Sequence, residues 1–138
     1  IGKGEKCSTG TQTALISIGH PGNFVTKAIE QLTTEGITPS HYNIRFLKPI
    51  DEDLLHDACK HHKHIITVED GTIIGGLGTA VAEFIAKYNY TNTLITLGIP
   101  DKFIEHGSLI ELYKECGFDV ENIIRTVKDC NNFKQQSS

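Results

Sequence analysis

Short apolar runs alternate along the chain with stretches of helical periodicity. Three of the runs are rich in β-branched residues and end at glycine, proline or acidic residues, which is typical of buried strands. They lie at residues 13–18, 64–69 and 93–97, and a further strand is predicted over residues 41–47. Between the runs, apolar residues recur every three or four positions, which indicates helices with one buried face.

The helices carry recognisable start and stop signals. One is predicted to have Pro21 in its first turn and to end at Gly36, and a second is predicted to be capped by Asp51. The clearest amphipathic pattern spans Leu77–Tyr88. Two more helices are expected towards the end of the chain, one after a capping box of Ser108 and Glu111 and one capped by Asp119.

Alternating strands and helices with short connections favour right-handed crossovers and a mainly parallel sheet. The pattern therefore predicts an α/β fold of three layers, with helices on both faces of the sheet. Residues 13–131 are expected to form this domain, with a linker over 1–12 and a frayed tail over 132–138. Because the sequence begins at Ile1 and contains no methionine, we expect it to be a piece of a longer protein.

Composition narrows the functional classes. A net charge of −4 argues against general binding to nucleic acids or to anionic membranes. No apolar run approaches the roughly 20 residues that span a bilayer. The four cysteines are scattered without a Cys-x-x-Cys pair, which favours free thiols over a disulfide framework.

The segment TVEDGTIIGGLGTAV, residues 67–81, places two acidic residues and several glycines between a strand and a helix. Such a turn can bind a phosphate at the helix N-terminus. However, the segment lacks the third glycine of a dinucleotide fingerprint and the lysine of a P-loop, and Glu69 and Asp70 would repel a phosphate. We therefore expect glycines of this segment such as Gly76 and Gly78 to allow positive φ angles or the close approach of another backbone, with phosphate binding as the alternative.

Two further groups of residues were weighed as sites. His56, His61, His62 and His64 lie close together in sequence, but their spacing and the intervening lysines favour a solvated basic turn over a zinc site. The cysteines on the helices are expected to be packed in the core, and His106 lies in a loop before a helix. The residues alone therefore predict no catalytic and no metal-binding group in this chain.

Three stretches together resemble the C-terminal domain of the 1-deoxy-D-xylulose-5-phosphate synthase family. They are IRFLKPID at 44–51, TVEDGTIIGGLGTAV at 67–81 and LGIPDKFIEHGS at 97–108. The first two are also similar to transketolases and to the β subunits of 2-oxo acid dehydrogenases. The resemblance implies a transketolase C-terminal domain-like fold over nearly the whole chain.

The resemblance also implies a function for the longer protein. This family condenses pyruvate with D-glyceraldehyde 3-phosphate, releasing CO₂, on thiamine diphosphate and Mg²⁺, at the start of isoprenoid precursor synthesis. The enzymes are cytoplasmic homodimers, and their cofactor-binding and catalytic residues lie in the domains that precede this one. No such residue is carried over to this chain, which is expected to bind no cofactor and to be inactive by itself.

The glycine-rich turn is then expected to shape an interface with the upstream domains or with a second subunit. The candidate interface residues are Glu69, Asp70, Gly75, Gly76, Gly78 and His106. Two alternatives stay open: the C-terminal part of a split transketolase or dehydrogenase subunit, and a stand-alone binding module on the same fold.

Overall fold

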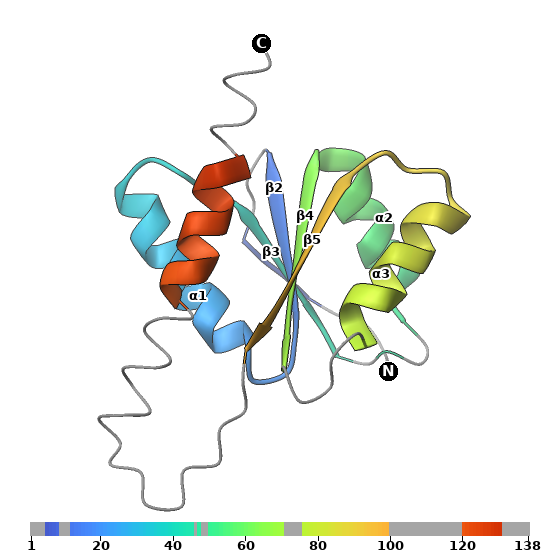
Figure 1. The fold of residues 1–138 in the computed structure, drawn as a ribbon, viewed down its shortest axis with the longest axis horizontal. Helices are drawn as coiled ribbons and strands as arrows, with labels where there is room; N and C mark the ends of the chain where they lie inside the picture. Colours follow the sequence, from blue (N-terminus) through green and yellow to red (C-terminus); the bar gives the residue numbers. More distant parts are fainter. Residues whose placement is uncertain are drawn as a thin grey trace, which may run out of the picture.

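The fold is a five-stranded sheet between two layers of helices (Figure 1). The computed structural model describes residues 5–8, 12–45, 47, 50–70, 76–99 and 120–130. The strands are β1 (Glu5–Ser8), β2 (Thr13–Ile18), β3 (Ser40–Ile44), β4 (His64–Asp70) and β5 (Thr93–Ile99). The helices are α1 (Gly22–Thr34), α2 (Glu52–His61) and α3 (Gly76–Lys87), and residues 120–130 are also helical.

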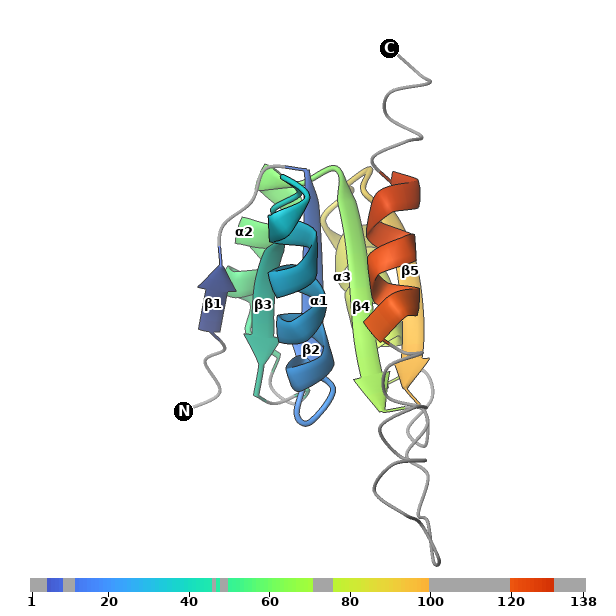
Figure 2. The same cartoon turned by 90° about the vertical axis from the view of Figure 1, so that its left-hand side faces the viewer.

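The sheet has the order β1-β3-β2-β4-β5, and β3, β2, β4 and β5 run parallel to one another. Helix α1 and the helical residues 120–130 cover one face, whereas α2 and α3 cover the other (Figures 1 and 2). The predicted three-layer α/β fold is therefore confirmed. No helix in the described part of the chain has both the length and the apolar character needed to cross a membrane.

The side chains on the two faces of the central strands contribute to two separate hydrophobic cores. In β4, Ile65 packs towards α2 and α3, and the next residue, Ile66, packs towards α1 and the helical residues 120–130. Both side chains are fully buried, and so is their neighbour in β2, Leu15. A strand covered on both faces needs apolar residues at consecutive positions, which explains why the strands read as continuous apolar runs.

Most element boundaries follow the sequence signals. Asp51 caps α2 by accepting a hydrogen bond from the Leu54 amide at 3.1 Å. Gly36 ends α1 with a φ of +80°, a left-handed conformation that costs glycine no steric strain. The predicted helix behind Ser108 and Glu111 lies outside the described residues, as does the predicted cap Asp119.

Two features of the sheet were not predicted. Residues Glu5–Ser8, within the expected linker, form an antiparallel edge strand on β3, with an irregular register between Lys6 and Ser8. Strand β3 ends at Ile44 rather than at Leu47, because its partner β2 ends at Ile18 and Gly19 then turns the chain into α1. Both differences depend on backbone pairing with a neighbouring strand. Such pairing leaves no apolar pattern in a short polar segment, so the sequence does not reveal it.

A polar pair lies between the sheet and the first turn of α1. The Ser17 hydroxyl and His41 Nε2 are hydrogen bonded at 2.8 Å, and both residues are buried. Gly22 leaves room for them, since a Cβ there would stand 3.1 Å from Ser17 Oγ. Burial lowers the pKa of His41 from 6.5 to about 4, so the imidazole is neutral in the native protein at physiological pH.

We expect the free energy of unfolding to fall as the pH is lowered from 6.5 towards about 4. In this range His41 is protonated in the unfolded chain and still neutral in the native one, so protons favour the unfolded state. The loss is on the order of 1–3 kcal/mol, measured by urea denaturation across the range. His41→Gln should flatten this dependence and the exposed-site control His20→Gln should keep it; equal slopes in the wild type and His41→Gln would contradict the assignment.

Candidate functional site

The candidate site lies where β4 ends and α3 begins, at the carboxyl edge of the parallel strands. This edge is where open α/β sheets commonly place functional groups. Of the six residues expected at an interface, Glu69, Gly76 and Gly78 are described with their surroundings. Asp70 is the last residue of β4 but its side chain is outside the described part, and Gly75 and His106 lie outside it altogether.

The Glu69 carboxylate occupies the N-terminus of α3. Its Oε1 accepts a hydrogen bond from the Leu77 amide at 3.1 Å, and its Oε2 accepts one from the Gly78 amide at 2.8 Å. Only 5% of Glu69 is exposed. The first amides of a helix and its dipole favour an anion at this place, and here the protein supplies that anion itself. A phosphate bound at the start of α3 would have to displace a buried carboxylate.

Gly78 is required by close packing between α3 and the sheet. A Cβ at this position would stand 2.6 Å from Thr96 Cγ2, on β5, and 3.3 Å from Glu69 Oε2. The first distance is shorter than real Cβ contacts, so a larger residue would push the helix away from the strand. We expected another backbone to approach this glycine closely, but the close neighbour is the side chain of Thr96.

The alternative role that we expected for these glycines, a positive φ, is wrong for Gly76 and Gly78. Both are part of α3 and have helical backbone conformation. Among the described glycines, positive φ angles occur at Gly19 and Gly36. Gly78 therefore serves the packing of α3 against β5.

Thr96 is the contributor to this corner that the sequence did not reveal. It stands in the middle of β5, where an alternating strand would present an ordinary half-buried side chain. Only the register of β5 with β4, which places Thr96 beside Thr67, brings it under Gly78. A shallow hollow of about 300 Å³ borders the corner and is lined by Glu69, Gly78, Thr96 and neighbouring residues of β5.

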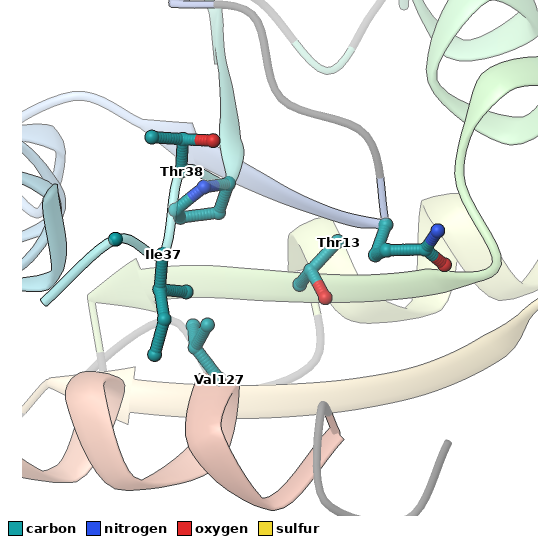
Figure 3. Close-up of a pocket in the computed structure, with 7 residues that line it drawn as sticks. Thr13, Ile37, Thr38 and Val127 are labelled. Carbon is teal, nitrogen blue, oxygen red and sulfur yellow. The ribbon is translucent and has the colours of Figure 1, made fainter. Parts of the chain in front are cut away.

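A smaller hollow of about 120 Å³ lies at the opposite end of the sheet (Figure 3). Thr13, Ile37, Thr38 and Val127 line it, together with Gln12, Gly36 and Pro39. The Thr13 hydroxyl is buried and has no hydrogen-bond partner among the described residues. None of the lining side chains titrates near neutral pH, so this hollow offers no acid or base for catalysis.

The histidines do not form the solvated basic turn that we predicted. His62 and His64 are 4% and 3% exposed. His62 Nδ1 donates to the Ala58 carbonyl at 2.9 Å, and its Nε2 is hydrogen bonded to the Ser40 hydroxyl at 2.7 Å. The prediction failed because the residues after α2 turn directly into β4 beneath the helix, which buries them. Of the four histidines, His61 is the exposed one, and its Nδ1 lies 3.2 Å from Asp57 Oδ1.

His56 belongs to an aromatic cluster between α2 and α3. Its ring packs edge-on against Phe84 and Tyr88, with centroid distances of 4.7 and 4.5 Å. Its Nδ1 is hydrogen bonded to the Tyr90 hydroxyl at 2.6 Å. His56, His61 and His62 thus contact different neighbours, and no group of three or more metal-ligating side chains comes together within the described ranges.

The described cysteines are core residues, as predicted. Cys59 and Cys130 are free thiols, and each is 5% exposed. Burial raises the pKa of Cys59 to about 11 and raises that of Cys130 as well, with a contribution from Asp129. A nucleophilic thiol needs a lowered pKa and access to solvent, so neither cysteine is suited to covalent catalysis.

We expect Gly78→Ala to lower the free energy of unfolding by about 1–3 kcal/mol, because the new methyl group overlaps Thr96. The same change at an exposed helical glycine would raise stability by up to about 1 kcal/mol. Thr96→Ser removes the overlapping Cγ2, so the Gly78→Ala/Thr96→Ser double variant should recover much of the loss in a denaturation cycle. Additive effects of the two substitutions would show that this contact does not set the position of α3.

Comparison with known proteins identifies the fold family. The family model for the transketolase C-terminal domain matches residues 2–123. The chain is 54% identical over 129 residues to the 1-deoxy-D-xylulose-5-phosphate synthase of Cytophaga hutchinsonii, covering 94% of this chain and 20% of that protein. It is 48% identical over 132 residues to the synthase of the same name from Bacteroides thetaiotaomicron, again covering 94% and 20%.

A solved structure gives the same result from the backbone. A protein described as "Split gene transketolase, inactive beta4 tetramer" matches with a TM-score of 0.76 and 26% identity. The match covers 93% of this chain and 42% of that one. The chain thus spans only a fraction of the length of each of these relatives. With a family model that matches most of its residues, the chain belongs to the transketolase C-terminal domain family.

Proposed function

We propose that this chain is the C-terminal domain of a 1-deoxy-D-xylulose-5-phosphate synthase and that it supports assembly of the enzyme rather than its chemistry. The observation that carries the proposal is the 54% identity over nearly the whole chain to a protein of that name, of which the match covers only 20%. The full-length transferase would condense pyruvate with D-glyceraldehyde 3-phosphate, releasing CO₂ and supplying the isoprenoid pathway.

The described residues do not fit the thiamine diphosphate and Mg²⁺ that this reaction uses. The glycine-rich corner was the candidate for a diphosphate, but the Glu69 carboxylate already accepts from the first amides of α3. A diphosphate there would meet a buried negative charge and no lysine or arginine among the described lining residues of the corner. We therefore propose that the upstream domains of the same polypeptide bind the cofactors.

In this proposal the corner is a rigid docking point. The Glu69 cap and the Gly78 contact fix the start of α3 against β5 without a ligand. Asp70, Gly75 and His106 would complete the contact with the upstream domains or with the second subunit of a homodimer. We further propose that the full-length enzyme is cytoplasmic, as the resemblance implies.

The similarity to a split gene transketolase supports a second candidate, in which this domain belongs to a separate subunit. This chain is 26% identical to the split gene transketolase and 54% identical to the synthase of Cytophaga hutchinsonii. The two candidates differ in the reaction of the whole enzyme and in the length of the reading frame that contains this domain, so both can be tested directly.

We expect the full-length protein, with thiamine diphosphate and Mg²⁺, to release CO₂ from pyruvate and glyceraldehyde 3-phosphate and to form 1-deoxy-D-xylulose 5-phosphate. Residues 1–138 alone should form no product and show no thermal shift with the cofactors, while their circular dichroism shows a cooperative unfolding transition. Ketol transfer between sugar phosphates by the full-length protein would favour the transketolase candidate. Saturable cofactor binding by residues 1–138 would refute the assembly role.

A further inference from the structure

A groove runs along the exposed side of α3 at the carboxyl edge of the sheet. It has a volume of about 550 Å³ and lies between Leu47 and Ile50, which follow β3, and the α3 residues Gly76, Ala80 and Phe84. Leu47 and Ile50 are half-buried and pack against the hydrophobic core, so the groove continues that core towards the surface. We call it the α3 groove.

The charges on the rim of the α3 groove do not balance, because two glutamates face one lysine. Glu52 and Lys87 form an ion pair at 3.5 Å and largely cancel each other, and the Tyr88 hydroxyl also donates to Glu52 at 3.2 Å. Glu83 is exposed on the same side of α3, and no described side chain pairs with it. An apolar floor with an acidic rim is complementary to an apolar segment that carries a lysine or an arginine.

The position of β1 indicates which part of the protein meets this groove. Strand β1 runs antiparallel to β3, and its first residue, Glu5, stands opposite Asn43, next to the last residue of β3 (Figure 2). Strand β1 therefore begins at the edge of the sheet at which β3 ends, the edge from which the chain continues to Leu47 and Ile50. The matched family is a C-terminal domain, and the relatives are about five times longer than the matched region, which covers 20% of them.

We propose that the α3 groove binds an apolar segment with a basic residue, contributed by the domain that lies upstream in the same polypeptide. A tethered segment has an effective concentration in the millimolar range, which favours it over a second copy of the chain for the same surface. The inference rests on the proposed function only in requiring that an upstream domain exists. Beyond the proposed function, it specifies which surface is bound, which part of the protein binds it, and that the partner presents a positively charged residue to Glu83.

The test places the photo-crosslinking residue p-benzoylphenylalanine at position 83 of the full-length protein. The matched control has the same residue in place of Glu30, an exposed glutamate of α1 on the opposite face of the sheet. After irradiation, the position-83 protein should give an adduct that migrates as a monomer, with its peptide partner upstream of Ile1. The adduct yield should fall several-fold when Ala80→Glu fills the groove and stay unchanged with Ala86→Glu, which lies outside it.

Three results would overturn the inference: a cross-linked dimer, an adduct within residues 1–138, or a yield at position 83 no higher than at position 30. Synthase activity of the unmodified full-length protein is measured in parallel. An active enzyme without the expected adduct refutes the docking surface alone. An inactive enzyme with the expected adduct refutes the proposed reaction and leaves the docking surface in place.

Discussion

The corner between β4 and α3 depends on one interaction, the pair of hydrogen bonds that the Glu69 carboxylate accepts from the amides of Leu77 and Gly78. The carboxylate is buried, and burying a charge is costly unless its oxygens are hydrogen bonded. The amide donors and the helix dipole offset this unfavourable free energy, and the hydrogen bonds fix where α3 begins. Gly78 then allows the helix to lie against Thr96 of β5. Cap, glycine and strand form one unit, since each is positioned by the other two.

This unit determines what the carboxyl edge of the sheet can do. A helix N-terminus with free amides is an anion-binding site, but here the site is filled from within the protein. What remains at the surface is the side of α3 that forms the α3 groove, an apolar surface with an acidic rim. Such a surface suits a protein partner better than a small anionic cofactor. The buried histidines and thiols are equally occupied in structural roles, with His62 bonded to Ser40 and Cys59 packed in the core.

The sequence predicted the architecture well because buried parallel strands and amphipathic helices leave strong local patterns. Strand β2 was predicted at its observed bounds, and the Asp51 cap and the Gly36 stop were both readable from single residues. The errors have a common cause, which is that they depend on contacts between distant segments. The pairing of β1 with β3, the burial of His62 and His64, and the contact between Gly78 and Thr96 leave no periodicity to read.

The candidate site shows the same division. The acids and glycines of residues 67–81 marked the corner, and the missing lysine argued against a P-loop. The reason that the corner is filled, a glutamate reaching eight and nine residues along the chain to two helix amides, could not be derived from the motif. Likewise, the sequence indicated an interface, whereas the groove and its acidic rim emerge only when the segment after β3 is placed beside α3.

The central claim is that Glu69 occupies the anion site of α3, and amide NMR on residues 1–138 tests it most directly. Titration with inorganic phosphate, and with thiamine diphosphate and Mg²⁺, should leave the amide signals of Leu77 and Gly78 in place, because both donate to the Glu69 carboxylate. In Glu69→Gln the two signals should shift and exchange faster with solvent, whereas the exposed control Glu83→Gln should leave them unchanged. A saturable shift of these two amides in the wild-type chain on adding either ligand would contradict the account.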